Sequence, residues 1–253
     1  MSFVIAIAGK GGTGKTTFSG LIVNYLIKKG KTPILAIDAD PSSNLNEALG
    51  EKINLTIGEL TEALATIDAS AQGGVSKIEQ MEYKINSAII EGKGFDLLAM
   101  GRPEGPGCYC HVNHLLKSTI TKLTKSYPYI VVDNEAGMEH LSRRTTGKAD
   151  LLLIISDPSP RGIEAAARIK EVSKEVKLDI KTIKLVINRV MNDKLYPESL
   201  RVIEKYGLEL AGTVPLDEAI MNLDGEKKPI FELPPESIAY QRVFNILDSL
   251  KIT

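Results

Sequence analysis

The chain has 253 residues, of which 43% are hydrophobic and 25% are charged, a composition typical of a folded globular protein. Its net charge of −1 gives no overall positive field to attract nucleic acid or anionic lipid. There is no apolar run of membrane-spanning length, no signal-peptide pattern and no disulfide framework. We therefore expect a cytoplasmic protein with one domain over residues 1–253, which acts on neither nucleic acid nor membrane.

Apolar runs alternate along the chain with segments in which apolar residues recur at helical spacing. The expected strands are Phe3–Ala8, Pro33–Ile37, Phe95–Met100, Tyr129–Val132, Leu151–Ile155, Ile183–Ile187 and Leu210–Val214. The expected helices are Thr16–Lys29, Val112–Lys125, Gly137–Thr146, Arg161–Lys174, Pro197–Lys205 and Glu236–Leu250.

This alternation predicts an α/β fold with a mostly parallel sheet of about seven to eight strands and helices on both faces. Ligands of such sheets bind beyond the carboxyl ends of the strands, so site residues are expected directly after each strand. Residues 51–94 show no clear pattern, and no role is assigned to them.

The stretch Ala8–Thr17, AGKGGTGKTT, lies between the first expected strand and the first expected helix. It fits the phosphate-loop pattern G-x-x-x-x-G-K-[ST]. Glycines let successive backbone N–H groups face one anion, and the helix that follows adds the positive end of its dipole. Lys15 is expected to contact the outer phosphates of ATP or ADP, and Thr16 to bind Mg²⁺. The nucleotide cradle comprises Gly11, Gly12, Thr13, Gly14, Lys15, Thr16 and Thr17.

The loop carries a second lysine, Lys10, that an ordinary phosphate loop does not need. The run GKGGTGKTT resembles the deviant Walker A sequence of the ATPase family that includes nitrogenase iron protein, MinD, ParA and the arsenite pump ATPases. The resemblance implies ATP hydrolysis by a single P-loop ATPase domain. It also implies a homodimer in which Lys10 reaches the nucleotide of the partner subunit. Whether the dimer forms without nucleotide is left open.

Two further segments resemble the switches of that family. Asp38-Ala39-Asp40-Pro41 is similar to the first switch, which implies that Asp40 orients the attacking water and that Asp38 and Asn44 help to hold the waters of Mg²⁺. An Asx turn is the alternative interpretation of Asp40.

The segment 133–137, DNEAG, resembles the second switch. Asp133 is then the Walker B aspartate that holds Mg²⁺ through a water, and the backbone N–H of Gly137 senses the γ-phosphate. A strand-ending turn with a buried aspartate is the alternative.

Two segments after later strands resemble the adenine pocket of the family. Asn188 corresponds to the residue that hydrogen-bonds adenine, and Arg189 to the residue that packs on the ring. Pro215, within Val214-Pro215-Leu216, would form the other wall.

The stretch 101–110, GRPEGPGCYC, is a glycine- and proline-rich loop that follows the expected strand Phe95–Met100. One C-x-C pair supplies two thiolates, whereas a closed metal site needs four ligands. In a two-fold dimer, Cys108 and Cys110 of both subunits would make a four-sulfur site suited to Ni²⁺ or Zn²⁺. Within one chain, the two cysteines with His111 and His114 would make a Cys₂His₂ site. Two semi-buried cysteines or a strained disulfide are the structural alternative.

GRPEGPGCYC also resembles the signature of CooC-type ATPases, which mature the nickel site of carbon monoxide dehydrogenase. The resemblance favours the shared four-sulfur site, because it extends only to the cysteines. It implies a nickel-binding maturation factor whose client is carbon monoxide dehydrogenase or the related acetyl-CoA synthase, with Zn²⁺ able to occupy the site in vitro. The alternatives are a MinD- or ParA-like positioning ATPase on membrane or DNA, and electron transfer as in nitrogenase iron protein. Electron transfer there uses two well-separated cysteines per subunit, a pattern that this chain lacks.

Overall fold

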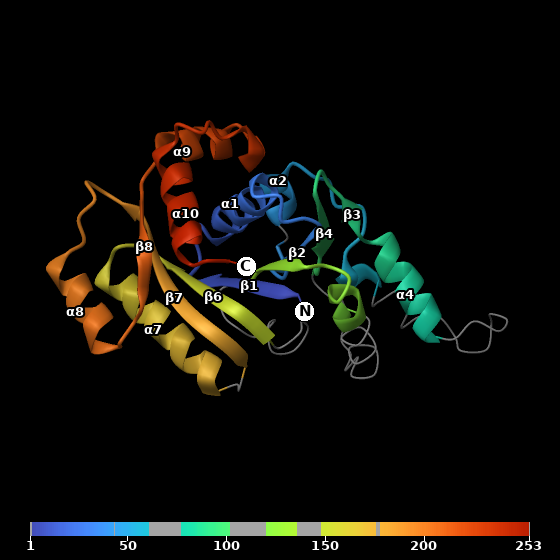
Figure 1. Cartoon of the computed structure of the whole chain (residues 1–253), viewed down its shortest axis with the longest axis horizontal. Helices are drawn as coiled ribbons and strands as arrows, with labels where there is room; N and C mark the ends of the chain where they lie inside the picture. The colour runs from blue at the N-terminus through green and yellow to red at the C-terminus, as the bar shows by residue number, and fades with distance from the viewer. Residues whose placement is uncertain are drawn as a thin grey trace.

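The computed structural model describes residues 2–42, 44–60, 77–101, 120–135, 148–175 and 178–252. Within these ranges eight strands form one sheet, in the order β3-β4-β2-β5-β1-β6-β7-β8 (Figure 1). All neighbouring strands are parallel except β3 and β4, which are antiparallel. The strands are β1 (Phe3–Gly9), β2 (Ile34–Asp38), β3 (Ile90–Glu91), β4 (Phe95–Ala99), β5 (Tyr129–Asp133), β6 (Lys148–Ser156), β7 (Asp179–Val190) and β8 (Leu210–Pro215).

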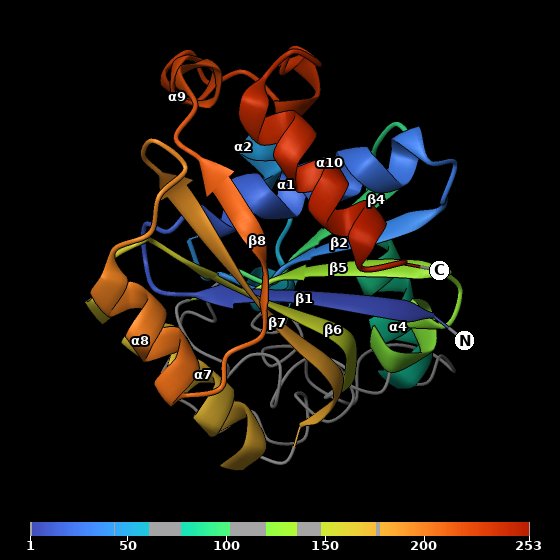
Figure 2. The ribbon, with the colours of Figure 1, turned by 60° about the vertical axis from the view of Figure 1, so that its left-hand side comes forward.

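Helices cover both faces of this sheet (Figures 1 and 2). One face packs against α1 (Lys15–Lys28), α2 (Leu45–Leu49), the 3₁₀ helix η1 (Ile230–Glu232) and α10 (Ile238–Ser249). The other face packs against α4 (Lys77–Ser87), α7 (Pro160–Glu175) and α8 (Pro197–Lys205). The remaining helix, α9 (Glu218–Gly225), lies beyond the end of β8. The predicted α/β fold is confirmed.

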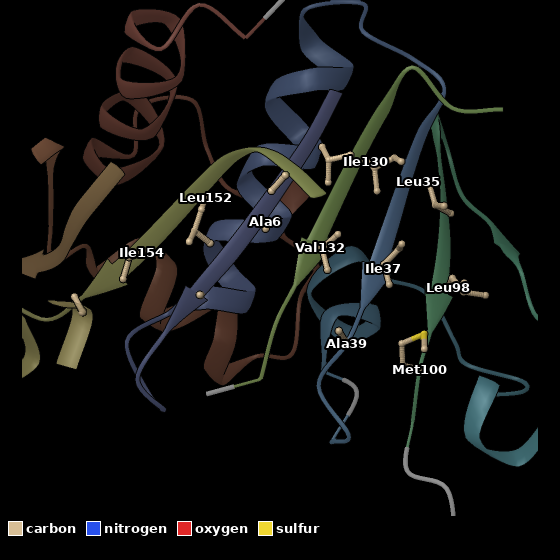
Figure 3. Close-up of a cluster of buried hydrophobic side chains, with 14 of the residues drawn as sticks. Ala6, Leu35, Ile37, Ala39, Leu98, Met100, Ile130, Val132, Leu152 and Ile154 are labelled. Atoms are coloured by element: carbon tan, nitrogen blue, oxygen red, sulfur yellow. The ribbon is translucent and has the colours of Figure 1, made fainter. Parts of the chain in front are cut away.

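The core consists of two apolar layers, one on each face of the sheet. Along β1, Ala6 belongs to the layer under α7, whereas Ile5 and Ile7 belong to the layer under α1. Figure 3 shows the same alternation on the neighbouring strands, where Val132 and Leu152 lie on the same side as Ala6. Because both faces are buried, the central strands are continuous apolar runs in the sequence, and this made them predictable.

The differences from the predicted elements concern segments with little burial. β6 and β7 begin at Lys148 and Asp179, earlier than expected. The first residues of both strands include exposed and half-buried positions, so they do not form the continuous apolar run from which the strands were predicted. The short elements α2, β3 and α9 were not predicted, and α4 lies in the stretch 51–94 that showed no pattern. The helix expected over Val112–Lys125 is described only from residue 120 onward; it is helical over 120–124, and Lys125 already lies in a turn. The expected helix Gly137–Thr146 lies outside the described residues.

The chain order around β1 determines where a ligand can bind. From β1 the chain crosses to β2 on one side, and later it continues to β6, β7 and β8 on the other. Such a reversal opens a crevice at the carboxyl ends of the strands, and the phosphate loop follows β1 at this point. Within the described ranges, no helix has the length and apolar character needed to cross a bilayer.

Candidate functional site

The phosphate loop connects β1 to α1 at the middle of the sheet. Gly14 precedes the helix in the left-handed conformation, with φ at 90°, and no side chain caps the first turn. At Gly9 the loop passes so close to the carbonyl of Ile155 in β6 that a Cβ atom would overlap it. The first N–H groups of an uncapped helix, together with its dipole, favour a bound anion. The local geometry therefore suits phosphate.

The phosphate loop is shaped in part by hydrogen bonds between its own residues. The Lys10 carbonyl accepts a hydrogen bond of 2.9 Å from the Thr13 hydroxyl and a longer one of 3.4 Å from the Thr13 N–H. The Lys15 ammonium, which is 8% exposed, donates to the same oxygen at 3.4 Å. A hydrogen bond of this length is weak, so the ammonium can move to a phosphate oxygen at little cost.

The end of β7 holds the loop from the other side. Nδ2 of Asn188 donates to the Thr13 carbonyl at 2.9 Å, and Nη1 of Arg189 donates to the Gly12 carbonyl at 2.8 Å. Arg189 has a φ of 59°, a conformation that is unusual for a residue other than glycine and that often marks functional sites. The two residues predicted to contact adenine thus hold the phosphate loop, and their contact with adenine stays a prediction.

A cavity of about 400 Å³ opens beside the loop. Its walls come from the start of α1, the end of β7, the segment after β8, and α9, with α10 behind them. This volume is in the range of small-ligand sites, and the mixture of apolar side chains with a few polar groups suits a planar base. The cavity brings together Asn188, Arg189 and Pro215, as predicted for the base pocket, with Thr17, Ile220 and Met221.

Two buried aspartates lie at the carboxyl ends of β2 and β5. Asp38 and Asp133 are direct partners in the parallel register and are 0% and 1% exposed. The carboxylate of Asp38 accepts hydrogen bonds from the N–H groups of Asp40, at 3.1 Å, and Leu45, at 2.9 Å. By contrast, neither oxygen of Asp133 has a partner within hydrogen-bond geometry among the described residues, although the Thr16 and Ser19 hydroxyls interact with the carboxylate more loosely.

Burial is the main cause of unusual pKa values at both aspartates. It raises the pKa of Asp38 to about 7 against the opposing effect of the Leu45 N–H, and the charge of Asp133 raises it further. It raises the pKa of Asp133 to about 6, although the Thr16 and Ser19 hydroxyls and the Lys15 ammonium lower it. Strongly shifted carboxylates in a crevice are typical of functional sites.

Residues 4–230 match the family described as the CobQ/CobB/MinD/ParA nucleotide binding domain. The chain belongs to this family. Its members are P-loop ATPases of the MinD/ParA type, so the predicted nucleotide binding and ATPase activity are confirmed at the level of the family.

Individual relatives agree with this assignment. The chain is 40% identical over 253 residues to an uncharacterized ATP-binding protein of Methanocaldococcus jannaschii, with 98% of each chain covered. It is 31% identical over 242 residues to the carbon monoxide dehydrogenase accessory protein CooC of Rhodospirillum rubrum, covering 91% of this chain and 90% of that protein. Its fold matches the MinD cell division protein of Aquifex aeolicus with a TM-score of 0.71 at 24% identity, covering 98% and 96% of the two chains.

P-loop ATPases use Mg²⁺ with the nucleotide, and the residues here fit that ion. The two Asp133 oxygens are buried without a hydrogen-bond donor among the described residues, and the Thr16 hydroxyl lies near enough to affect the pKa of Asp133. Such an orphaned carboxylate is costly unless a cation or its waters satisfy it. Asp133 and Thr16 would hold Mg²⁺, which neutralises charge on the phosphates when bound.

The first-switch residues are placed beside this site. Oδ1 of Asp40 accepts a hydrogen bond of 2.8 Å from the Ser42 N–H, which is the Asx turn considered as its alternative role. The turn does not prevent Asp40 from orienting water, and that role stays a prediction. Asn44 is exposed and does not cap α2, so its help in holding the waters of Mg²⁺ also stays a prediction.

Several predicted site residues lie outside the described part of the chain: Gly137, Cys108, Cys110, His111 and His114. Among the residues that are described, no three histidine, cysteine or acidic side chains gather as a metal site. The nickel ligands therefore stay predictions.

The part of the pocket that α9 forms was not predicted from the sequence. Ile220 and Met221 line the cavity, and Asp217 caps the helix by accepting a hydrogen bond of 2.8 Å from the Ala219 N–H. An aspartate that follows a strand and precedes a glutamate is a helix-start signal. The helix is short and buries no residue, so the apolar pattern was too weak to reveal it.

We predict that Gly14→Ala weakens both the fold and nucleotide binding. The new Cβ would lie 2.6 Å from Nδ2 of Asn188, which must then leave the Thr13 carbonyl, and a φ of 90° strains alanine. The free energy of unfolding should fall by about 1–3 kcal/mol, and the Kd for ATP should rise about tenfold or more. Urea denaturation and calorimetry measure the two effects.

Gly207→Ala is the matched control. Gly207 also has a left-handed φ, of 54°, but nothing lies within 4 Å of its added Cβ. It should show the strain without the loss of ATP affinity. Equal ATP affinity in the two variants would show that displacing the Asn188 amide from the Thr13 carbonyl does not affect ATP binding.

Proposed function

We propose that this ATPase is a cytoplasmic maturation factor that binds nickel and inserts it into carbon monoxide dehydrogenase or the related acetyl-CoA synthase. The whole chain, residues 1–253, would act as one domain and as a nucleotide-dependent homodimer. Two similarities support the proposal: the GRPEGPGCYC stretch with its C-x-C pair, and the 31% identity to the carbon monoxide dehydrogenase accessory protein CooC.

The C-x-C pair carries the proposal, and the described residues connect the nucleotide site to the start of the segment that holds this pair. Ala99, at the end of β4, is the register partner of Asp38, and the Met100 N–H donates to the Asp38 carbonyl at 2.8 Å. Gly101, the last described residue before the segment, is buried and packs against Thr56. A change at Asp38 when nucleotide binds would therefore be transmitted to the start of the cysteine segment.

In the proposed cycle, Lys15, Thr16 and Asp133 hold ATP with its Mg²⁺, and Lys10 reaches the nucleotide of the partner. The closed dimer brings together the thiolates of both subunits, which bind nickel as a cargo. Asp40 orients the water that attacks the γ-phosphate, the bond between the β- and γ-phosphates breaks, and ADP and phosphate form. Loss of the γ-phosphate contacts opens the dimer, and nickel passes to the client.

The proposal predicts tight nickel binding that depends on the two cysteines. We expect one Ni²⁺ per two chains when nickel is titrated anaerobically into protein with a non-hydrolysable ATP analogue, because each chain supplies two of four thiolates. In the Cys108→Ser, Cys110→Ser double variant, nickel affinity should fall about a hundredfold or more. Its ATPase rate should stay within about twofold, because thiolates take no part in phosphoryl transfer.

The stoichiometry separates the two metal sites that the sequence leaves open. One nickel per chain, with a similar loss in a His114→Ala variant, would replace the shared four-sulfur site by the Cys₂His₂ site. Unchanged nickel affinity in the double cysteine variant would remove the metal role and leave an ATPase of another purpose.

The rival function is that of a positioning ATPase on membrane or DNA, since the matched family includes MinD and ParA. A membrane-surface helix is typically rich in lysine and arginine. Helix α10, IAYQRVFNILDS, has Arg242 as its single basic residue. Co-sedimentation with anionic liposomes or with DNA in the presence of ATP tests the rival directly: ATP-dependent binding to either, combined with absent nickel binding, would favour it.

A further inference from the structure

Helix α9 forms one wall of the base cavity but is poorly anchored to the protein. Ile220 and Met221 line the cavity, yet none of the residues of α9 is buried, and Met221 is 57% exposed. Only partial contacts of Ala219, Ile220 and Leu223 join the helix to the core. Helices as short as this one are not stable in water without tertiary packing. Something other than a buried face must therefore hold the wall in place.

The carboxylate of Asp217 provides that attachment. Oδ1 accepts a hydrogen bond of 2.8 Å from the Ala219 N–H in the first turn of α9. Oδ2 accepts hydrogen bonds from the Ser237 hydroxyl, at 2.6 Å, and from the Ala239 N–H in the first turn of α10, at 2.9 Å. Ser237 in turn caps α10 by accepting a hydrogen bond of 3.1 Å from the Tyr240 N–H. One side chain thus joins the first turns of two helices.

The two helices differ in how firmly they are held. Helix α10 buries Ala239, Val243, Ile246 and Leu247 against the sheet and α1, and Val243 reaches the cavity. Figure 2 shows α9 beyond the carboxyl end of β8, outside the layer that contains α10. Burial alone would raise the pKa of Asp217. The hydrogen bonds from the Ser237 hydroxyl and from the N–H groups of Ala239 and Ala219 outweigh this effect and hold the pKa of Asp217 below its usual value. The side chain is therefore charged at neutral pH, which strengthens these hydrogen bonds.

We propose that α9 is a movable wall of the base pocket and that Asp217 is the positioning residue that holds this wall at the spacing of a nucleotide base. A bound base would bury Ile220 and Met221, which stabilises the wall in its closed position. Helix α9 also lines a second hollow with Thr16 and Thr17. The hydrogen bonds that shape the phosphate loop come from Thr13, Lys15, Asn188 and Arg189 and not from α9, so phosphate binding is expected not to need the wall. This inference rests on nucleotide binding by the ATPase and does not depend on nickel.

The test is Asp217→Asn, which keeps the size of the side chain but loses one acceptor and the charge. We expect the KM for ATP to rise about tenfold, with kcat within about twofold. The asparagine oxygen can still accept the hydrogen bond from the Ala219 N–H, but its NH₂ group cannot accept those from the Ser237 hydroxyl and the Ala239 N–H, which leaves these donors of α10 unsatisfied. The affinity for magnesium tripolyphosphate, a probe without base or ribose, should not change. A general weakening of the fold would instead lower both affinities.

Two further measurements keep the inference testable if that variant folds poorly. Ser237→Ala removes one of the three hydrogen bonds to Asp217 and should raise the KM for ATP about threefold, roughly half of a tenfold change on a logarithmic scale. In the unaltered protein, ADP should slow hydrogen exchange of the α9 amides, whereas tripolyphosphate should not.

Asp193→Asn is the matched control, because Asp193 pairs with Arg242 of α10 at 3.4 Å and is absent from the lining of the base cavity. It should leave the KM for ATP unchanged. The inference is wrong if Asp217→Asn weakens ATP and tripolyphosphate equally, or if ADP and tripolyphosphate protect α9 to the same extent. Both of these outcomes leave the nickel proposal untouched.

Discussion

We expect Asp133→Asn to make the nucleotide-free protein more stable while reducing ATP hydrolysis about a hundredfold or more. The carboxylate of Asp133 is buried, accepts no hydrogen bond from a described residue and lies beside Asp38. It therefore destabilises the nucleotide-free protein, and in the proposed site its negative charge would be stabilising only when Mg²⁺ and nucleotide are bound. Function and stability have opposite requirements at this position.

The pH dependence of this effect follows from the direction of the pKa shift. Burial raises the pKa of Asp133 from 3.8 to about 6, so the folded protein prefers the protonated form. The contribution of this group to stability is complete below pH 4 and is lost as the pH rises through about 6. At pH 8 the asparagine variant should be more stable by about 1–2 kcal/mol, because it avoids the buried charge but still buries a polar amide.

Urea denaturation without nucleotide at pH 8 and pH 5 measures the difference, which should shrink at the lower pH. Asp179→Asn is the control, because the Asp179 side chain is 67% exposed and pairs with Lys148 at the edge of the sheet. It should change stability little at both pH values. An Asp133→Asn variant less stable than the unaltered protein at pH 8 would show that the Thr16 and Ser19 hydroxyls satisfy the carboxylate in the nucleotide-free protein.

We expect Lys10→Ala to reduce the ATPase rate about a thousandfold, the scale of a cationic group supplied in trans to phosphoryl transfer. The Lys10 side chain is exposed. It is the Lys10 carbonyl that accepts hydrogen bonds from Thr13 and Lys15 and shapes the loop. Removing the side chain should therefore leave the loop and the ATP affinity of a single subunit nearly unchanged.

A mixing experiment separates action in trans from action in cis. Lys10→Ala protein has an intact site but no bridging lysine, whereas Lys15→Ala protein has a defective site but keeps Lys10. If Lys10 acts across the dimer, mixing the two inactive proteins should restore part of the activity, because the mixed dimer contains one complete site. A mixture that stays inactive would contradict the trans role. Lys125→Ala is the control: it changes an exposed lysine before β5 and should be fully active.

The features that were predicted correctly are local in the sequence. The phosphate loop was recognisable because its glycines, Lys15 and Thr16 are contiguous, and the geometry of the turn requires those residues at those positions. Helix α8 was predicted with both of its ends, Pro197 and Lys205, because proline at a helix start and an apolar stripe are both read directly from neighbouring residues.

Other features depend on contacts between distant segments. Nothing in the residues around Asn188 indicates that its amide holds the Thr13 carbonyl, and nothing near Asp217 indicates that its carboxylate holds the start of α10. The shifted pKa values of Asp38 and Asp133 arise because β2 and β5 are neighbours in the sheet although other strands separate them in the chain.

By itself the sequence determined the fold class, the nucleotide-binding loop and the strand ends at which polar site residues lie, since hydrophobic periodicity and glycine spacing act over a few residues. Only the tertiary structure decided which of these polar groups share a hydrogen bond, which carboxylate is left without a donor, and that a poorly buried helix lines the cavity beside the phosphate loop. The physical reason is that burial and hydrogen-bond partnership are properties of the packed chain: the same aspartate has a low pKa in water and a raised one when the folded sheet excludes water around it.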